Sequence, residues 1–239
     1  RVSGKTTSGP NALRIFWIIL IRRIFGLTFT IKLLEKHERT IIQHYNMYLR
    51  AAPEELKPQI RALIDEETIH EREMIEHIKE ETVVFMGNII LGVNDGLIEL
   101  TGALVGFASA FTNNALIGFT GLIVGVSASL SMAASAYMQA RQEEERSPRK
   151  AAGYTGVAYI IVVLLLVSAF FIFDDTIHAL LVMLGIVCLI IALTSYYVSV
   201  IFERSFRAQF GEMFLFSVGV AAISFTIGTI FRLMTGVMV

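Results

Sequence analysis

Four polar side chains interrupt an apolar stretch, residues 87–110, that is long enough to cross a bilayer as a helix: Asn88, Asn94, Asp95 and Glu99. An acid at membrane depth costs at least ~2.5 kcal/mol, so acids in such a stretch usually mark the path of an ion or substrate. At 100° per residue, one helix face carries Asn88, Gly92, Asp95, Glu99, Gly102 and Gly106. The sequence therefore predicts the path of an ion or substrate along this face, with Asp95, Glu99 and Asn88 as its candidate ligands.

The alternative for these carboxylates is an acid near one end of the span that snorkels to water. Asp95 lies more than two turns in from Gly87, and Glu99 lies deeper still. A position inside the span is therefore favoured.

A second group of acids lies before this stretch, in a predicted hairpin of two amphipathic helices, residues 31–50 and 54–81. Glu38 shares the apolar seam of the first helix, and Glu67 and His70 share that of the second. A di-iron four-helix bundle needs two Glu-x-x-His pairs and two further Glu residues. One hairpin supplies half of this set, so a homodimer with two-fold symmetry would complete the bundle.

The hairpin resembles one half of a ferritin-like or rubrerythrin-like domain. This resemblance implies iron bound by Glu38, Glu67 and His70, with Glu35 as an assisting ligand. The alternative is a charged, solvated linker that binds no metal.

The composition is typical of a membrane protein. Hydrophobic residues make up 54% of the chain, the mean hydropathy is +0.63, and charged residues make up 17%, against roughly 25% in soluble domains. The net charge of −1 provides no basic field for nucleic acid. The single cysteine, Cys188, excludes a disulfide within the chain.

Five predicted transmembrane helices occupy residues 82–239 and make the fold all-α and polytopic, with the hairpin on the cytoplasmic side. They are Val83–Ala110, Ala115–Arg141, Ala151–Phe173, Thr176–Phe202 and Glu212–Thr235. The connectors after the second and fourth spans carry basic residues, whereas the other two carry none. The positive-inside rule therefore predicts a cytoplasmic N-terminus and an external C-terminus.

Residues 1–30 precede the hairpin, which covers residues 31–81. Residues 1–10 are interpreted as a flexible lead. The stretch 11–31 is apolar but contains Arg14, Arg22 and Arg23. We predict an interfacial amphipathic helix on the cytoplasmic leaflet, with a sixth span as the alternative.

The second span is rich in small residues. Gly121-x-x-x-Gly125 allows a close approach of helices, as do Gly92-x-x-x-Gly96 and Gly102-x-x-x-Gly106 in the first span. Met132 lies in this small-residue zone, and its thioether suits a late first-row cation better than Mg²⁺ or Ca²⁺. Packing is the alternative role for a methionine in a membrane helix.

Three stretches together resemble the vacuolar iron transporter family: Gly92-Val-Asn-Asp-Gly96, Ser131-Met-Ala-Ala134 followed by Tyr137, and Phe210-Gly-Glu-Met-Phe214 through Gly228. The resemblance covers residues 83–239. It implies a homodimer of five-span subunits in which the first two helices line the iron path between the subunits. It also implies Asp95 and Met132 as ion ligands.

The chain departs from this family at several positions. Asn88 and Val124 stand where members often carry acids, and Ser135-Ala136 replaces a common Gly-Glu. Glu99 replaces part of the lost charge. Plant-type members carry a Glu-rich metal-binding domain between spans two and three, and the hairpin before span one resembles its substitute. This arrangement resembles prokaryotic fusions of a rubrerythrin-like domain with the transporter, which implies a prokaryotic plasma membrane.

These patterns favour a transporter that exports Fe²⁺, with Mn²⁺ as a second cargo, in exchange for protons across a lipid bilayer. Carboxylates that must ionise to hold a metal, and that are more stable protonated when empty, couple the two ions. The alternative is an enzyme, a membrane-anchored ferroxidase whose hairpin oxidises Fe²⁺. A plain anchor has no need of Asp95 and Glu99 in its first span.

Overall fold

The computed structural model describes residues 84–143 and 147–236, together with single positions and short pieces between residues 16 and 61. The described residues contain helices and no strand. The chain divides into two units. The first comprises Arg1–Val83 with Val200–Glu203, and the second comprises Val84–Ser199 with Arg204–Val239.

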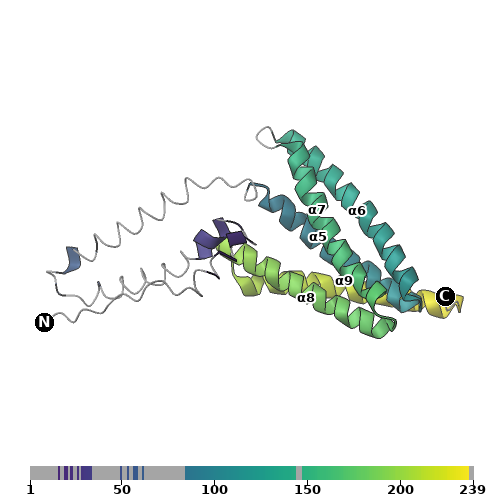
Figure 1. The fold of residues 1–239 in the computed structure, drawn as a ribbon. Helices are drawn as coiled ribbons and strands as arrows, with labels where there is room; N and C mark the ends of the chain where they lie inside the picture. The colour runs from purple at the N-terminus through teal and green to yellow at the C-terminus, as the bar shows by residue number, and fades with distance from the viewer. Residues whose placement is uncertain are drawn as a thin grey trace. The chain divides into compact units, whose positions relative to one another are not determined.

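Five long helices make up the second unit (Figure 1): α5 (Met86–Ala110), α6 (Asn114–Gln142), α7 (Pro148–Ile172), α8 (Thr176–Ile201) and α9 (Phe206–Thr235). Each is at least 25 residues long, and their most apolar windows have mean hydropathies of 1.5 to 2.7. A helix needs about 20 apolar residues to cross a bilayer. The predicted all-α fold with five membrane-spanning helices is therefore confirmed.

Helix α9 begins earlier than the sequence pattern indicated, at Phe206 instead of Glu212. Phe206 stacks on Phe210, and Phe210 on Phe214, with ring centroids 5.8 Å apart in each pair. These rings are spaced four residues apart and meet only on a helix. The additional turns therefore extend the helix beyond its apolar segment. Helix α7 also starts earlier, because Pro148 is acceptable in a first turn.

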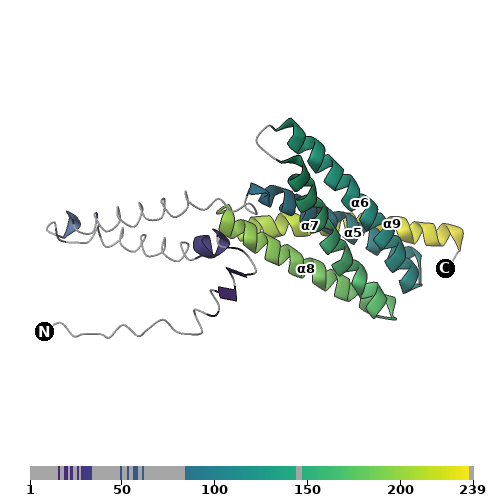
Figure 2. The same cartoon turned by 45° about the horizontal axis from the view of Figure 1, so that its top comes forward.

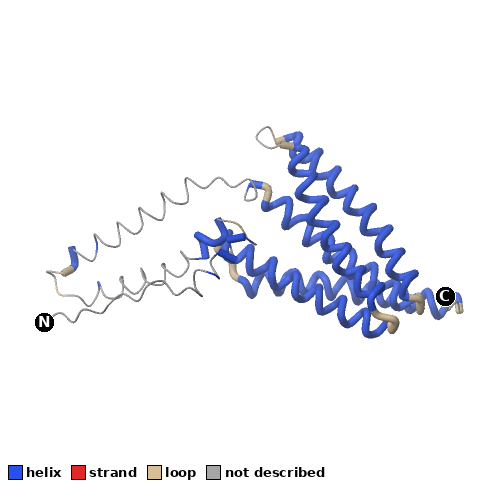
Figure 3. Tube along the Cα trace, in the orientation of Figure 1, coloured by secondary structure: helices blue, strands red, loops and turns tan. Residues whose placement is uncertain are grey.

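The connectors between the membrane-spanning helices are short (Figure 3). Asn114 Nδ2 donates to the carbonyl of Phe173 at 2.7 Å, and Asn114 Oδ1 accepts from the hydroxyl of Thr176 at 2.6 Å. Asp175 Oδ2 accepts from the backbone N–H of His178 at 2.9 Å and lies 2.6 Å from its Nδ1. The hydrogen bond from the His178 backbone makes the largest contribution to lowering the pKa of Asp175, and the hydrogen bond with the imidazole ring lowers it further. These bonds fix the start of α8 beside the start of α6.

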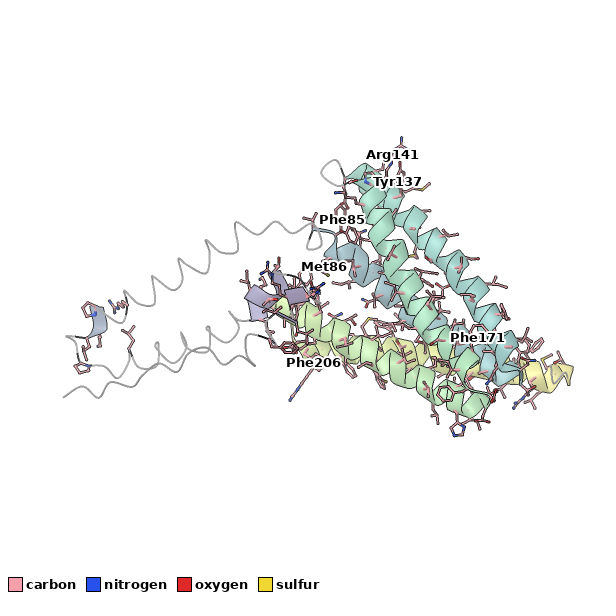
Figure 4. All side chains as sticks on the ribbon, in the orientation of Figure 1. Phe85, Met86, Tyr137, Arg141, Phe171 and Phe206 are labelled. Carbon is pink, nitrogen blue, oxygen red and sulfur yellow. The ribbon has the colours of Figure 1, made fainter. Side chains whose placement is uncertain are left out.

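Aromatic and basic side chains occupy the start of α5, the end of α6 and the start of α7, away from the hydrogen bonds of Asn114. Phe85 stacks on Tyr154 with a centroid distance of 5.2 Å and an interplanar angle of 15°. Tyr137 and Arg141 lie near the end of α6, and Phe171 lies at the far end of α7 (Figure 4). Arg141 in the last turn of α6 complements the helix dipole.

Small residues allow the closest packing in the second unit. Helices α6 and α7 pack against each other along their length, and α5 crosses both α7 and α9 (Figure 2). A Cβ on Gly125 would lie 2.5 Å from Val163, and a Cβ on Gly118 would lie 2.9 Å from Phe171. The predicted close approach at small-residue motifs is confirmed, and it occurs between helices of the same chain. The apolar core includes Leu97, Leu100, Leu104, Tyr159, Leu166, Met183 and Ile191.

Within the first unit, residues 28–33 are helical, and Phe29 is buried. Lys32 Nζ lies 3.3 Å from Glu203 Oε1 in an ion pair. Most of residues 1–30, and nearly all of the predicted hairpin, lie outside the described residues. The interfacial helix and its alternative, a sixth span, therefore stay predictions.

Candidate metal-transport site

The polar face of α5 is shared between two neighbouring helices. In its first half, Asn88 Nδ2 donates to Thr155 Oγ1 of α7 at 3.3 Å, and a Cβ on Gly92 would strike the carbonyl oxygen of Thr155. In its second half, Gly102 and Gly106 face Val220 and Ser224 of α9. The face that the sequence predicted is therefore packed within the subunit at both ends.

Asp95 and Glu99 occupy the middle of this face, one turn apart. Glu99 Oε2 accepts a hydrogen bond from the hydroxyl of Tyr159 on α7 at 2.7 Å. The Tyr159 side chain is completely buried in the core, so that its hydroxyl is held in position by packing. Asp95 interacts electrostatically with Glu99 and with Tyr159. The structure therefore groups two carboxylates of α5 and one phenol of α7 near the middle of the membrane-spanning helices.

The two carboxylates differ in exposure. Asp95 is half-buried, whereas Glu99 is exposed on the surface of the single subunit. An acid facing hydrocarbon is costly, so acids in spans face water, a polar partner or the interior of an assembly. The exposed side of Glu99 therefore needs one of these surroundings.

Asn88 is buried next to α7, and its amide is only half used. The Nδ2 atom is bonded to Thr155, whereas Oδ1 is buried with no hydrogen-bond partner among the described residues. A buried carbonyl oxygen without a partner can accept from water or bind a hard cation. The predicted ligand role of Asn88 is compatible with this position.

Met132 lies on α6 and packs, half-buried, against the apolar core. Its neighbours Ser129 and Ala133 contact Gly156 of α7: Ser129 Oγ donates to the Gly156 carbonyl at 3.1 Å. Gly156 precedes Tyr159 by one turn. One stretch of α7 therefore supports both Glu99 and the part of α6 that carries Met132.

A complete metal site does not form within the described part of the chain. Among those residues, no three His, Cys, Asp or Glu side chains gather closely enough to hold a metal ion. The predicted hairpin ligands Glu35, Glu38, Glu67 and His70 lie outside the described residues. Of the predicted ligands in the membrane helices, the structure describes Asn88, Asp95, Glu99 and Met132, and their ligand role stays a prediction.

Sequence reasoning did not identify Tyr159 and Thr155, which bond the polar face of α5. Both lie in a span that is otherwise nearly all aliphatic. A buried tyrosine usually finds a hydrogen-bond partner for its hydroxyl, so the presence of Tyr159 in an apolar span indicated a polar partner on a neighbouring helix. Its partner was not detectable, because Glu99 lies 60 residues away in the sequence.

Comparison with known proteins gives one family match. Residues 86–147, which contain α5 and α6, match the model of the VIT family. No curated protein and no solved structure matches the chain. The matched segment contains Asp95, Glu99 and Met132. This match and the five membrane-spanning helices fit a member of the vacuolar iron transporter family.

Proposed function

We propose that this protein exports Fe²⁺ from the cytoplasm as a homodimer, in exchange for protons, with Mn²⁺ as a second cargo. The VIT family match indicates a membrane metal ion transporter. The observation that carries the proposal is the hydrogen bond from buried Tyr159 to Glu99, one turn from Asp95 in the middle of a span. A membrane anchor needs no such group.

The carboxylates of Asp95 and Glu99 bind the cation. Side chains one turn apart on a helix lie about 5–6 Å apart at Cβ, so the ionised pair attracts a divalent ion and repels itself without one. Proton uptake relieves this repulsion when the metal leaves. The pair therefore exchanges metal for protons, and the Tyr159 hydroxyl keeps Glu99 in place through the cycle.

The exposed side of Glu99 supports a dimer. A second subunit placed against this side of α5 would cover the carboxylate and supply a second set of the same ligands. Two subunits together would then offer four carboxylates, where one subunit offers only Asp95 and Glu99. Asn88 and Met132 extend the same path. The thioether of Met132 favours Fe²⁺ over harder divalent ions.

The orientation of the protein in the membrane follows from the charge of the connectors, and export is then proposed as movement away from the side on which they lie. Arg141, Arg149 and Lys150 lie at the α6–α7 end, and Arg204 and Arg207 lie at the α8–α9 end. The positive-inside rule assigns these connectors to the cytoplasm, in a prokaryotic plasma membrane by the fusion resemblance. Glu35, Glu38, Glu67 and His70 would then bind iron on the cytoplasmic side before it enters the path.

Metal flux in sealed proteoliposomes tests the proposal. When a proton gradient is imposed, the wild-type protein should move Fe²⁺ in the direction opposite to the protons. Asp95→Asn should abolish this flux while the protein stays folded. The change keeps the side-chain volume and removes the charge. Wild-type flux in Asp95→Asn would contradict the proposed path. Absence of flux in the wild type, with iron oxidation instead, would favour the membrane-anchored ferroxidase.

A further inference from the structure

A second feature of the membrane unit is a cavity of about 410 Å³ between α5, α8 and α9. Its walls are mostly apolar and include Leu180, Leu184, Val187, Phe214 and Val218. Thr101, Ser217, Thr226 and Cys188 contribute the polar atoms. Thr101 and Glu99 are about 200° apart around α5 at 100° per residue. The cavity is therefore on the other side of α5 from the proposed metal path.

Two hydroxyls that line this cavity are buried and have no partner among the described residues. The Thr101 side chain is 1% exposed and that of Ser217 is 2% exposed. Neither Thr101 Oγ1 nor Ser217 Oγ makes a hydrogen bond there. A buried hydroxyl without a partner is costly in an apolar environment, so an occupant of the cavity must supply one.

Several other hydroxyls on these membrane helices are satisfied by their own helix, although Ser195 Oγ and Thr229 Oγ1, which do not line this cavity, are also buried without a partner among the described residues. Thr120 donates to the carbonyl of Leu116 at 2.7 Å, Thr194 to that of Ile190 at 2.8 Å, and Thr226 to that of Ala222 at 2.8 Å. Such a bond to the preceding turn is the usual way to satisfy a hydroxyl in lipid. Thr101 and Ser217 do not use it, which distinguishes them from Thr226 in the same cavity.

We propose that this cavity is a hydrated recess, in which water molecules bond the hydroxyls of Thr101 and Ser217. A hydrocarbon chain would fit the apolar walls but would leave both hydroxyls unpaired. A water molecule occupies about 30 Å³ in the liquid and bonds two to four polar groups, so the recess has room for several. Water therefore enters the membrane unit at a place separate from the acids of α5.

The reactivity of a single cysteine can show whether water is present in this recess. Cys188 lines the cavity and is the only cysteine in the sequence. A thiol reacts with alkylating reagents as the thiolate, and it ionises only where water reaches it. In the full-length protein in lipid nanodiscs, Cys188 should react with a charged methanethiosulfonate. A chain with Cys188→Ser and Leu189→Cys should react at least about tenfold more slowly, because both residues are exposed on α8 but only Cys188 lines the cavity.

Removal of the two hydroxyls should exclude the water. The double variant Thr101→Val with Ser217→Ala keeps the shape of both side chains closely and should slow labelling of Cys188 at least about tenfold. Thr226→Val is the matched control: its hydroxyl is already bonded to Ala222, so labelling should not change. Equal labelling in the double variant and the wild type would overturn the proposal.

X-ray radiolytic footprinting provides a test that does not depend on reagent size. Radicals form from water bound at the site, so the sulfur of Cys188 should be oxidised in the wild type and much less in the double variant. If only lipid-soluble maleimide labels Cys188, and radiolysis leaves its sulfur unchanged, a lipid chain fills the cavity and the hydrated recess is ruled out.

Discussion

The phenol of Tyr159 is the group by which α7 reaches the acids of α5. Tyr159→Phe removes the bond to Glu99 and leaves the buried ring in place. A hydrogen bond to a charged group contributes about 1.5–3 kcal/mol, and each 1.4 kcal/mol is about tenfold. The stability of the fold should therefore fall by no more than about this amount. Metal flux should fall at least about tenfold, because Glu99 is no longer held in position, when both are measured on the same preparation.

Glu99→Gln separates the hydrogen bond from the charge at this position. The amide oxygen of Gln can still accept from Tyr159, but it cannot take up or release a proton. Flux should persist in part while its coupling to protons weakens, as read from the pH change inside the vesicles. If both variants match the wild type in flux and proton movement, Glu99 and Tyr159 serve only to pack α5 against α7.

Met132 is the residue for which packing and ligation are hardest to distinguish. Met132→Leu conserves volume and should cost less than about 1.5 kcal/mol of stability. As a ligand, Met132 favours Fe²⁺, so the variant should lose selectivity for Fe²⁺ over Mg²⁺ and Ca²⁺ in a competition flux assay. Met138→Leu, on the same helix but 67% exposed, is the control. An unchanged selectivity profile would assign Met132 to packing.

At the scale of single residues, the sequence predicted the acids but not their surroundings. Asp95 and Glu99 were recognisable because acids are rare in apolar stretches, and this depends on local sequence alone. The bonds to Tyr159 and Thr155 join positions 60 and 67 residues apart. Spacing along one helix contains no information on which neighbour it meets, and these partners therefore required the structure.

At the scale of elements, the crossing of α5 and α9 depends on glycine. A Cβ on Gly228 would collide with Ser109 Oγ and with the carbonyl oxygen of Gly106. Gly228→Ala should therefore separate the two helices and destabilise the membrane unit by about 1–3 kcal/mol, the usual cost of overpacking. Thermal unfolding in detergent measures this change.

Gly219→Ala on the same helix is the matched control. A Cβ there meets nothing within 4 Å, so only helix propensity changes, and stability should rise by up to about 1 kcal/mol. If Gly228→Ala is as stable as Gly219→Ala, the crossing of α5 and α9 in the membrane is wider than the structure shows.

The helices themselves were largely predictable, because the length of an apolar run is a direct signal for a span. The predicted ends of α8 and of the first span differ from the observed ends by at most three residues. Helix α9 was the exception. Its first turn carries Arg207 and is held by stacked phenylalanines, so hydropathy alone placed the start at Glu212.

At the scale of the whole molecule, the remaining question is how the N-terminal acids relate to the membrane path. The sequence predicts Glu38, Glu67 and His70 as half of a di-iron ligand set, which two chains would complete. If the proposed dimer forms this site, bound iron should amount to about one ion per chain. Unpaired carboxylates on apolar seams repel one another, so iron should also raise the thermal stability of the N-terminal part.

His70→Ala should remove this iron and reduce flux only in part, because the ligands at Asp95 and Glu99 remain. His37→Ala is the control, since His37 falls on the predicted solvated face of the same hairpin. Iron content measured on the purified full-length dimer decides between the two roles of the hairpin. If His70→Ala and His37→Ala bind as much iron as the wild type, the N-terminal acids form a solvated linker, and metal handling belongs to the membrane helices alone.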